Sequence, residues 1–189
     1  FYLSDLIKNF KIEEVQKAGA IFDITKLDWV NSQHLANLSI DDFKSHIKPF
    51  LKKIGIEIED HPNFELMINA MRSSENTLSG IAESLVPYFK DISDFDSKAI
   101  DKFLYEGSGI LEDIKDILLK VDNWNETTLD SVLKNYQNEY NLTVPKVNQP
   151  IRIALTGSTK SPSLGLTLSI FGKEESIKRI QNLIDIINK

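Results

Sequence analysis

The fold class depends on one stretch of the sequence, Pro150-Ile151-Arg152-Ile153-Ala154-Leu155-Thr156-Gly157. Residues Ile151–Leu155 are the only run that competes as a β-strand, and a run of five such residues is ambiguous by periodicity alone. Helical patterns surround the run on both sides, and the sequence offers no partner strand. We therefore predict that it forms a short buried helix and that the protein is all-α.

The flanking sequence supports this interpretation. After Gly157 a loop rich in small residues runs to Ser163, and the apolar run 164–171 then stops at Gly172. The last segment places Ile177, Ile180, Leu183, Ile184 and Ile187 at the spacing of one amphipathic helix face. Towards the N-terminus, the same spacing recurs in almost every segment.

Capping residues divide these patterns into separate helices. Ser39, followed by Asp42, resembles a capping box, and Pro49 is expected to kink the helix that follows. The other predicted N-terminal positions are Ser4, Thr25, Pro62 and Thr77, and the predicted C-terminal stops are Gly55, Gly107 and Gly172.

A polar stretch, Asp91–Asp96, separates two groups of helical patterns. A chain of 189 residues fits one large domain or two small ones. We predict two helical subdomains that meet near residue 92. The chain has no cysteine, which excludes disulfides and thiolate zinc sites, and no apolar run long enough to span a bilayer.

The charges are unevenly distributed. The net charge of −6 argues against a broad, sequence-blind nucleic-acid binder. Residues 143–189, however, hold seven Lys and Arg against three Asp and Glu, whereas residues 1–142 carry a net charge of −10. This asymmetry fits either a surface that meets a polyanion or an ordinary solvated face.

Residues suited to catalysis are scarce. His34, on a mainly apolar face, is interpreted as a hydrogen-bonded structural residue. His46 and His61 are predicted to be surface or cap residues. The run from Gly157 to Ser161 lacks the glycine that precedes lysine in a phosphate-binding loop. We predict no catalytic residue and no metal site.

Arginine usage is more informative than the net charge. The chain holds 19 Lys but only three Arg, at positions 72, 152 and 179. Lysine supplies a point charge, whereas arginine supplies a planar fork that reads base edges and stacks on rings. Each arginine is therefore a candidate for a geometric role, with an ordinary surface cation as the equal alternative.

Several segments carry a family resemblance. Arg152–Gly157, the Pro162-centred loop and Phe171-Gly172-Lys173-Glu174 together resemble the C-terminus of bacterial-type glutamyl-tRNA synthetases. Phe22–Asn31 and Met71–Leu78 are similar to segments that precede it in that family. The family's catalytic signatures, of the His-Ile-Gly-His and Lys-Met-Ser-Lys-Ser types, do not occur here.

The resemblance implies a C-terminal anticodon-binding region without the catalytic domain, a view that the missing initial Met supports. Its expected division is a stem-contact remnant at 1–36 and helical subdomains at 37–91 and 92–189. The fragment would be no enzyme and hold no cofactor, because ATP and Mg²⁺ belong to the parent enzyme's catalytic domain. It would act in the cytoplasm, as a monomer, without a membrane.

The resemblance also implies site residues. Arg72 corresponds to the arginine expected near the third anticodon base, and Arg152 to the arginine before the family's Ala-Leu-Thr-Gly run. Ser161, Pro162 and Leu164 correspond to the loop that meets the first two bases. The implied partner is tRNA(Glu), with tRNA(Gln) left open. The alternative function is a helical protein-interaction domain that binds an acidic partner through its basic C-terminal segment.

Overall fold

The computed structural model describes residues 2–15, 19, 21–57, 63–72, 74–92, 94–104 and 108–189, and all regular elements in these ranges are helical. The predicted all-α class is confirmed. In chain order the elements are α1 (Leu3–Asn9), the 3-10 helix η1 (Ile12–Glu14), α2 (Ile24–Asn37), α3 (Ile40–Lys53), α4 (Phe64–Arg72), α5 (Leu78–Phe89), α6 (Ser97–Phe103), α7 (Gly109–Leu119), α8 (Glu126–Glu139), α9 (Val144–Thr156) and α10 (Leu164–Ile187).

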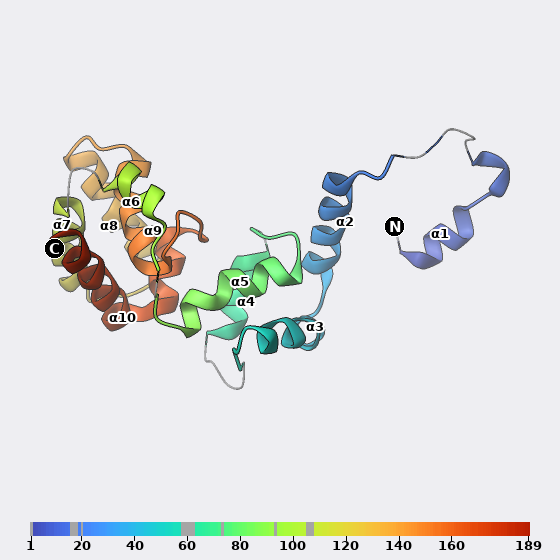
Figure 1. Cartoon of the computed structure of the whole chain (residues 1–189), viewed down its shortest axis with the longest axis horizontal. Coiled ribbons are helices and arrows are strands. Elements are labelled where there is room, and N and C mark those ends of the chain that lie inside the picture. Colours follow the sequence, from blue (N-terminus) through green and yellow to red (C-terminus); the bar gives the residue numbers. More distant parts are fainter. Residues whose placement is uncertain are drawn as a thin grey trace.

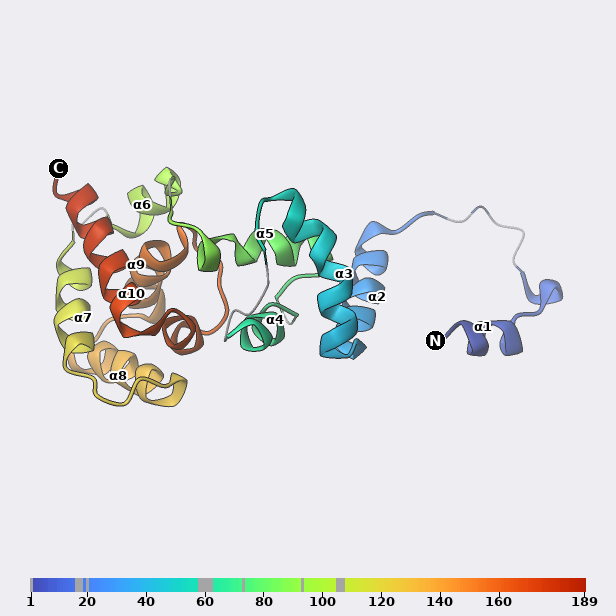
Figure 2. The same ribbon diagram turned by 90° about the horizontal axis from the view of Figure 1, so that it is seen from below.

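The helices are arranged along an elongated molecule. Helices α6 to α10 form a group at one end, α3 to α5 lie in the middle, and α2 stands beside α3 (Figures 1 and 2). Helix α1 lies apart from the rest in both views. The chain therefore places its C-terminal residues in one compact group and its N-terminal residues at the far end.

Two hydrophobic clusters hold the helices together. The N-terminal cluster contains Phe43 and Ile47 of α3 and Leu85 of α5, all fully buried. The C-terminal cluster is built from α6 to α10 and includes Leu111 and Ile180. Burying one such side chain contributes about 1.5–3 kcal/mol, so each cluster is a substantial source of stability.

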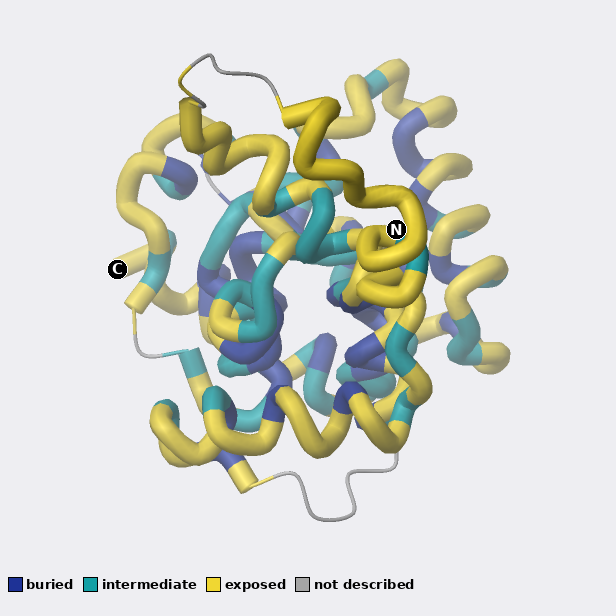
Figure 3. The backbone as a smooth tube through the Cα atoms, turned by 90° about the vertical axis from the view of Figure 1, so that its right-hand side faces the viewer, coloured by how far each residue is buried: buried dark blue, intermediate teal, exposed yellow. Residues whose placement is uncertain are grey.

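The N-terminal segment contributes little to either cluster. No residue of α1 or η1 is buried, and the apolar side chains of Leu3 and Ile21 are 72% and 94% exposed. Figure 3 shows the long run of exposed backbone around the N-terminus. The helix predicted from the spacing of Leu3, Leu6 and Ile7 is present as α1. Its apolar face is not covered by any other described residue and stays exposed.

The capping predictions have mixed outcomes. The Ser39 and Thr77 hydroxyls accept hydrogen bonds from the Asp42 and Gly80 amides, as predicted. The predicted cap at Thr25 is wrong, because the Asp23 carboxylate lies closer to the start of α2 and accepts from the Lys26 amide at 3.1 Å.

The remaining expectations concern the starts, the ends and the interior of helices. Helix α1 begins at Leu3 with Tyr2 as its N-cap, so the predicted cap at Ser4 is wrong. Helix α3 runs through Pro49 to Lys53, and the turn after it uses Gly55 in the left-handed region. Pro62 and Gly107 lie outside the described residues.

The run Ile151–Leu155 is helical, as predicted. The four apolar residues of this run are fully buried in the last turns of α9, whereas Arg152 is half-buried. Helix α9 is longer than the short helix we expected. Gly157 ends α9 with φ 74°, and its amide donates to the Ile153 carbonyl at 2.8 Å. After the loop, α10 breaks its helical geometry at Gly172, where a stop was predicted.

Replacing Gly157 tests this helix end. In Gly157→Ala, the new Cβ would lie 3.0 Å from Ile92 Cγ2 and 3.2 Å from the Asp94 carbonyl oxygen, at a positive φ. We expect urea unfolding to show a loss of about 1–3 kcal/mol in the free energy of unfolding. Gly109→Ala is the control, because its Cβ would meet nothing within 4 Å and should cost no stability. Equal stability of both variants would show that the end of α9 does not require glycine at this position.

Candidate functional site

Arg152 organises the loop that follows α9. Its Nε donates to the Ser161 hydroxyl at 2.8 Å, and its Nη2 donates to the Pro162 carbonyl at 3.2 Å. The side chain is partly buried, and this desolvation lowers its pKa from the ordinary value. These two bonds leave Nη1 of Arg152 without a hydrogen bond to any described residue, so the guanidinium retains donors for a ligand.

Hydrogen bonds of polar side chains hold the rest of the loop in place. The Ser158 hydroxyl accepts from the Lys160 amide, and the Thr167 hydroxyl donates to the Ser163 carbonyl at 2.9 Å. Ser163 also caps α10 and donates to the Glu126 carboxylate of α8 at 2.7 Å. The loop is therefore fixed to α8, α9 and α10 by its polar side chains.

Leu164 differs from its neighbours in the predicted site. Its side chain is only 3% exposed and belongs to the C-terminal cluster. Any contact that a ligand makes at this position must therefore use the main chain. Ser161 and Pro162 are half-buried and remain partly accessible.

Arg72 lies in the other group of helices, as the last residue of α4. Its Nη1 donates to the Leu38 carbonyl at 3.0 Å and its Nη2 to the Ser39 carbonyl at 3.4 Å. Its guanidinium carbon lies 4.4 Å from the centre of the Phe43 ring. Arg72 thus ties α4 to the junction between α2 and α3, and desolvation lowers its pKa.

One donor of Arg72 stands out. Its Nε is buried and has no hydrogen-bond partner among the described residues. A buried donor that is left unpaired costs about 1–3 kcal/mol, so it is normally satisfied by protein, water or a ligand. The two Nη atoms of Arg72 therefore stabilise the fold, while its Nε remains an unused donor.

The structure brings together part of the predicted site. Arg152, Ser161 and Pro162 are in direct contact, and Leu164 follows them at the start of α10. The contacts of Arg72 with described residues all lie in the N-terminal half of the chain. The predicted residues thus form one local group and one separate position.

Sequence reasoning missed Tyr88. Its ring stacks on Phe171 with the centroids 4.7 Å apart, and its buried hydroxyl has no hydrogen-bond partner in the part of the chain that the structure describes. Burial raises the pKa of Tyr88, while the nearby Thr167 hydroxyl and the charges of Arg152 and Arg179 lower it. A tyrosine in a helical pattern carries no sequence signal for such a position, because its partners come from α9 and α10.

The histidine expectations are corrected in part. His34 is exposed and has no hydrogen bond to a described residue, so its interpretation as a hydrogen-bonded structural residue is wrong. The reason is that its side of α2 is not covered by another described helix. His46 lies on the surface, and its Nδ1 is 2.6 Å from the Asp42 carbonyl oxygen. His61 lies outside the described residues.

The described residues hold no group of three or more His, Cys, Asp or Glu placed to bind a metal ion. None of their helices combines the length and the apolar character that crossing a membrane requires.

Comparison with known proteins gives the family. Residues 42–184, about three quarters of the chain, match the model of a family described as "Anticodon binding domain". The chain belongs to the anticodon-binding domain family. The matched residues include Arg72, Arg152 and the loop between α9 and α10.

Full-length relatives share this region. The chain is 32% identical to the glutamate–tRNA ligase of Myxococcus xanthus, over 93% of the chain and 37% of that protein. It is 30% identical to the enzyme of Thermus thermophilus, over 97% of the chain and 39% of that protein. The chain thus spans less than half the length of the curated relatives it matches.

Solved structures agree with the sequence relatives. A glutamate–tRNA ligase from Elizabethkingia meningosepticum superimposes with a TM-score of 0.80 at 25% identity, over 97% of this chain and 36% of that one. The enzyme from Elizabethkingia anophelis gives a TM-score of 0.77 at 26% identity, over 96% of this chain and 36% of that one. The predicted resemblance is confirmed, and the alternative of a protein-interaction domain finds no support in these comparisons.

The contact between Arg152 and the loop is testable by Ser161→Ala. Because this variant removes the acceptor of a charged donor that is half-buried, we expect the free energy of unfolding to fall by about 1–2 kcal/mol. Amide hydrogen exchange should also accelerate over residues 158–163. In the control, Ser131→Ala, an exposed hydroxyl loses only its bond to the Thr127 carbonyl within α8. A loop unchanged in exchange would contradict the organising role of Arg152.

Proposed function

We propose that this chain binds the anticodon arm of tRNA(Glu), as the anticodon-binding part of a glutamate–tRNA ligase. The match to the anticodon-binding domain model over residues 42–184 carries this proposal. The chain itself supplies binding and selectivity. The parent enzyme would join glutamate to tRNA with ATP and Mg²⁺ in a catalytic domain outside this chain, as a monomer in the cytoplasm.

The proposal assigns parts of the chain to parts of the tRNA. Residues 1–36 are assigned to the stem-contact region, and 37–91 and 92–189 to two helical anticodon-binding subdomains. The two hydrophobic clusters support this division, since one draws mainly on α2 to α5 and the other on α6 to α10.

The loop group is assigned to the first two anticodon bases. Sequence-specific RNA recognition splays unpaired bases, stacks them and hydrogen-bonds their edges. Arg152 offers a half-buried guanidinium with unused donors, beside a loop whose Ser161 and Pro162 are already held in place. Leu164 would offer only its main chain, because its side chain is buried.

Arg72 is assigned to the third anticodon base. Its guanidinium is held over the Phe43 ring and by two carbonyl acceptors, so the plane of the fork is fixed before RNA binds. Pre-organised donors lose less entropy on binding. Its place at the end of α4, in a different cluster from Arg152, suits contact with a different base.

The direct test of the loop assignment is binding of a tRNA(Glu) anticodon stem-loop to Arg152→Lys. This variant keeps the charge but loses the planar fork, and one good base-edge contact is worth about 1–3 kcal/mol. We therefore expect a roughly tenfold or greater rise in Kd, measured by fluorescence anisotropy. The matched control, Lys134→Ala, removes an exposed cation from α8 and should leave the Kd nearly unchanged.

A salt series separates base reading from charge attraction. General attraction to phosphates weakens steeply with salt and does not depend on sequence. If Arg152→Lys binds as tightly as the parent chain at all salt concentrations, the assignment of Arg152 fails. If Lys134→Ala weakens binding as much as Arg152→Lys does, charge alone governs binding.

The third-base assignment is tested by one base substitution. The parent chain is expected to prefer a stem-loop with C at the third anticodon position over one with G, and Arg72→Lys should reduce that preference by about tenfold. Circular dichroism must first show that Arg72→Lys is folded, because Arg72 also contacts α2 and α3. Equal binding of both stem-loops by the parent would place tRNA(Gln) among its partners and contradict a reading role for Arg72.

A further inference from the structure

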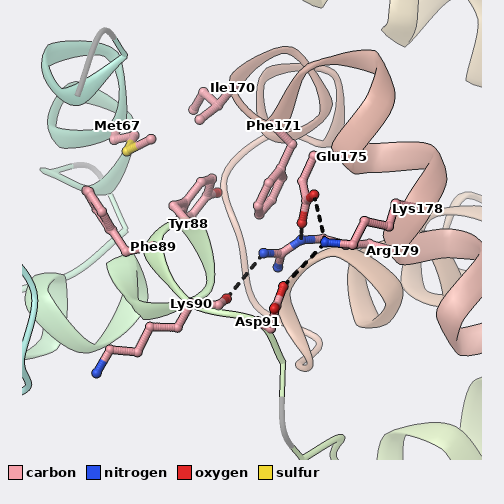
Figure 4. A pocket seen from close by; sticks show the side chains of 10 residues that line it. All are labelled: Met67, Tyr88, Phe89, Lys90, Asp91, Ile170, Phe171, Glu175, Lys178 and Arg179. Atoms are coloured by element: carbon pink, nitrogen blue, oxygen red, sulfur yellow. Dashed lines mark hydrogen bonds and ion pairs between the residues drawn. The ribbon is translucent and has the colours of Figure 1, made fainter.

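Arg179 of α10 is the most completely engaged arginine of the chain. It is only 7% exposed, and its Nε donates to the Glu175 carboxylate at 2.6 Å. Its Nη1 donates to the Leu155 carbonyl at 2.9 Å and its Nη2 to the Lys90 carbonyl at 3.2 Å. Its guanidinium carbon lies 4.5 Å from the centre of the Phe171 ring. Figure 4 shows the Arg179 side chain beside Phe171 and Glu175.

These partners come from three helices. Leu155 lies in the last turn of α9, three residues after Arg152, and Lys90 is the C-cap of α5. Carbonyls at the C-terminal end of a helix lack intrahelical partners and carry partial negative charge, so a buried cation is favoured there. One side chain thus satisfies the ends of two helices that belong to different clusters.

An aromatic contact reinforces the same junction, which is the place where Arg179 links the ends of α5 and α9. Phe171 stacks face to face on Tyr88 of α5, with the ring planes 8° apart, and packs against both clusters. On the solvent side, the Lys178 ammonium lies 3.6 Å from Asp91 and 3.3 Å from Glu175. These two ion pairs of Lys178 are largely exposed to solvent and contribute little to stability. The buried Arg179 is therefore the main polar link of the junction.

The junction lies between the two arginines of the proposed site. Helix α5 packs against α3 and α4, which carry Phe43 and Arg72, whereas α9 carries Arg152. The angle between α5 and α9 therefore sets where Arg72 stands relative to the Arg152 loop. A guanidinium can bridge two carbonyls and a carboxylate in one plane, which a lysine ammonium on a flexible stem does not reproduce.

We propose that Arg179 is a positioning residue, which aligns the two halves of the RNA-reading surface so that both ends of the anticodon are read by the same molecule at once. It touches no base itself. This inference rests on the proposed function. When the halves are held at a fixed spacing, the second contact forms at high effective concentration, and a loosened junction lowers that concentration.

The absence of cysteine from the whole sequence allows a clean distance measurement. Spin labels on Lys52→Cys in α3 and Lys134→Cys in α8 report the spacing of the two halves by pulsed EPR. We expect one narrow distance distribution in the parent and a broader one in Arg179→Lys. In the same variant, the Kd for the tRNA(Glu) stem-loop should rise about tenfold.

Two further variants complete the test, one that weakens the same junction by another contact and one that serves as a control. Phe171→Leu removes the stack on Tyr88 while it keeps an apolar side chain, so it should broaden the distribution in the same direction, even if Arg179→Lys fails to fold. Lys178→Gln, the control, loses only the exposed ion pairs and should behave as the parent does.

The results separate the two proposals. If the parent chain does not distinguish cognate from substituted stem-loops, the proposed function fails, and the positioning role fails with it. If the parent does distinguish them, while Arg179→Lys and Phe171→Leu keep both the narrow distribution and the parent Kd, only the positioning role is overturned. A broadened distribution with an unchanged Kd also overturns it, because the junction would then be architectural alone.

Discussion

The turn of α10 around Ile170 and Phe171 is the contact on which the arrangement of the two clusters depends. Ile170 is a buried member of the N-terminal cluster, although its helix belongs mainly to the C-terminal one. Phe171 packs against both clusters, and the helical geometry breaks immediately afterwards at Gly172. Leu164 and Leu168, before the break, and Ile180 and Leu183, after it, belong to the C-terminal cluster, so the turn around Ile170 is where α10 reaches into the N-terminal one.

The three arginines follow one physical rule. Arg72, Arg152 and Arg179 each donate to main-chain carbonyls that lie at helix ends or in the loop before a helix. Such carbonyls have no regular partner, and a planar fork satisfies them without losing all of its donors. Scarce arginines therefore act first as elements of the fold. On the proposed assignment, Arg72 and Arg152 would also contact RNA, so a chain of net charge −6 would read bases with a few placed side chains.

The sequence predicts the local features of this fold better than its long-range contacts. Ser39 and Thr77 were predictable as caps because a capping bond spans only three residues. The helical state of Ile151–Leu155 followed from its neighbours. The bond from Arg179 to the Lys90 carbonyl was not predictable, because a carbonyl has no sequence signature and lies 89 residues away. The burial of Leu164 was missed for a similar reason, since the positions implied by resemblance do not say which atoms are accessible.

A chain that reads anticodon bases must distinguish RNAs of equal charge by their sequence. The most direct measurement is the Kd of the unmodified chain for a tRNA(Glu) anticodon stem-loop and for the same stem-loop with all three anticodon bases replaced, at one fixed salt concentration. Each mismatched base contact costs about 1–3 kcal/mol, so we expect the two affinities to differ by at least about a hundredfold. Equal affinities for the two stem-loops would show that the chain does not read anticodon bases.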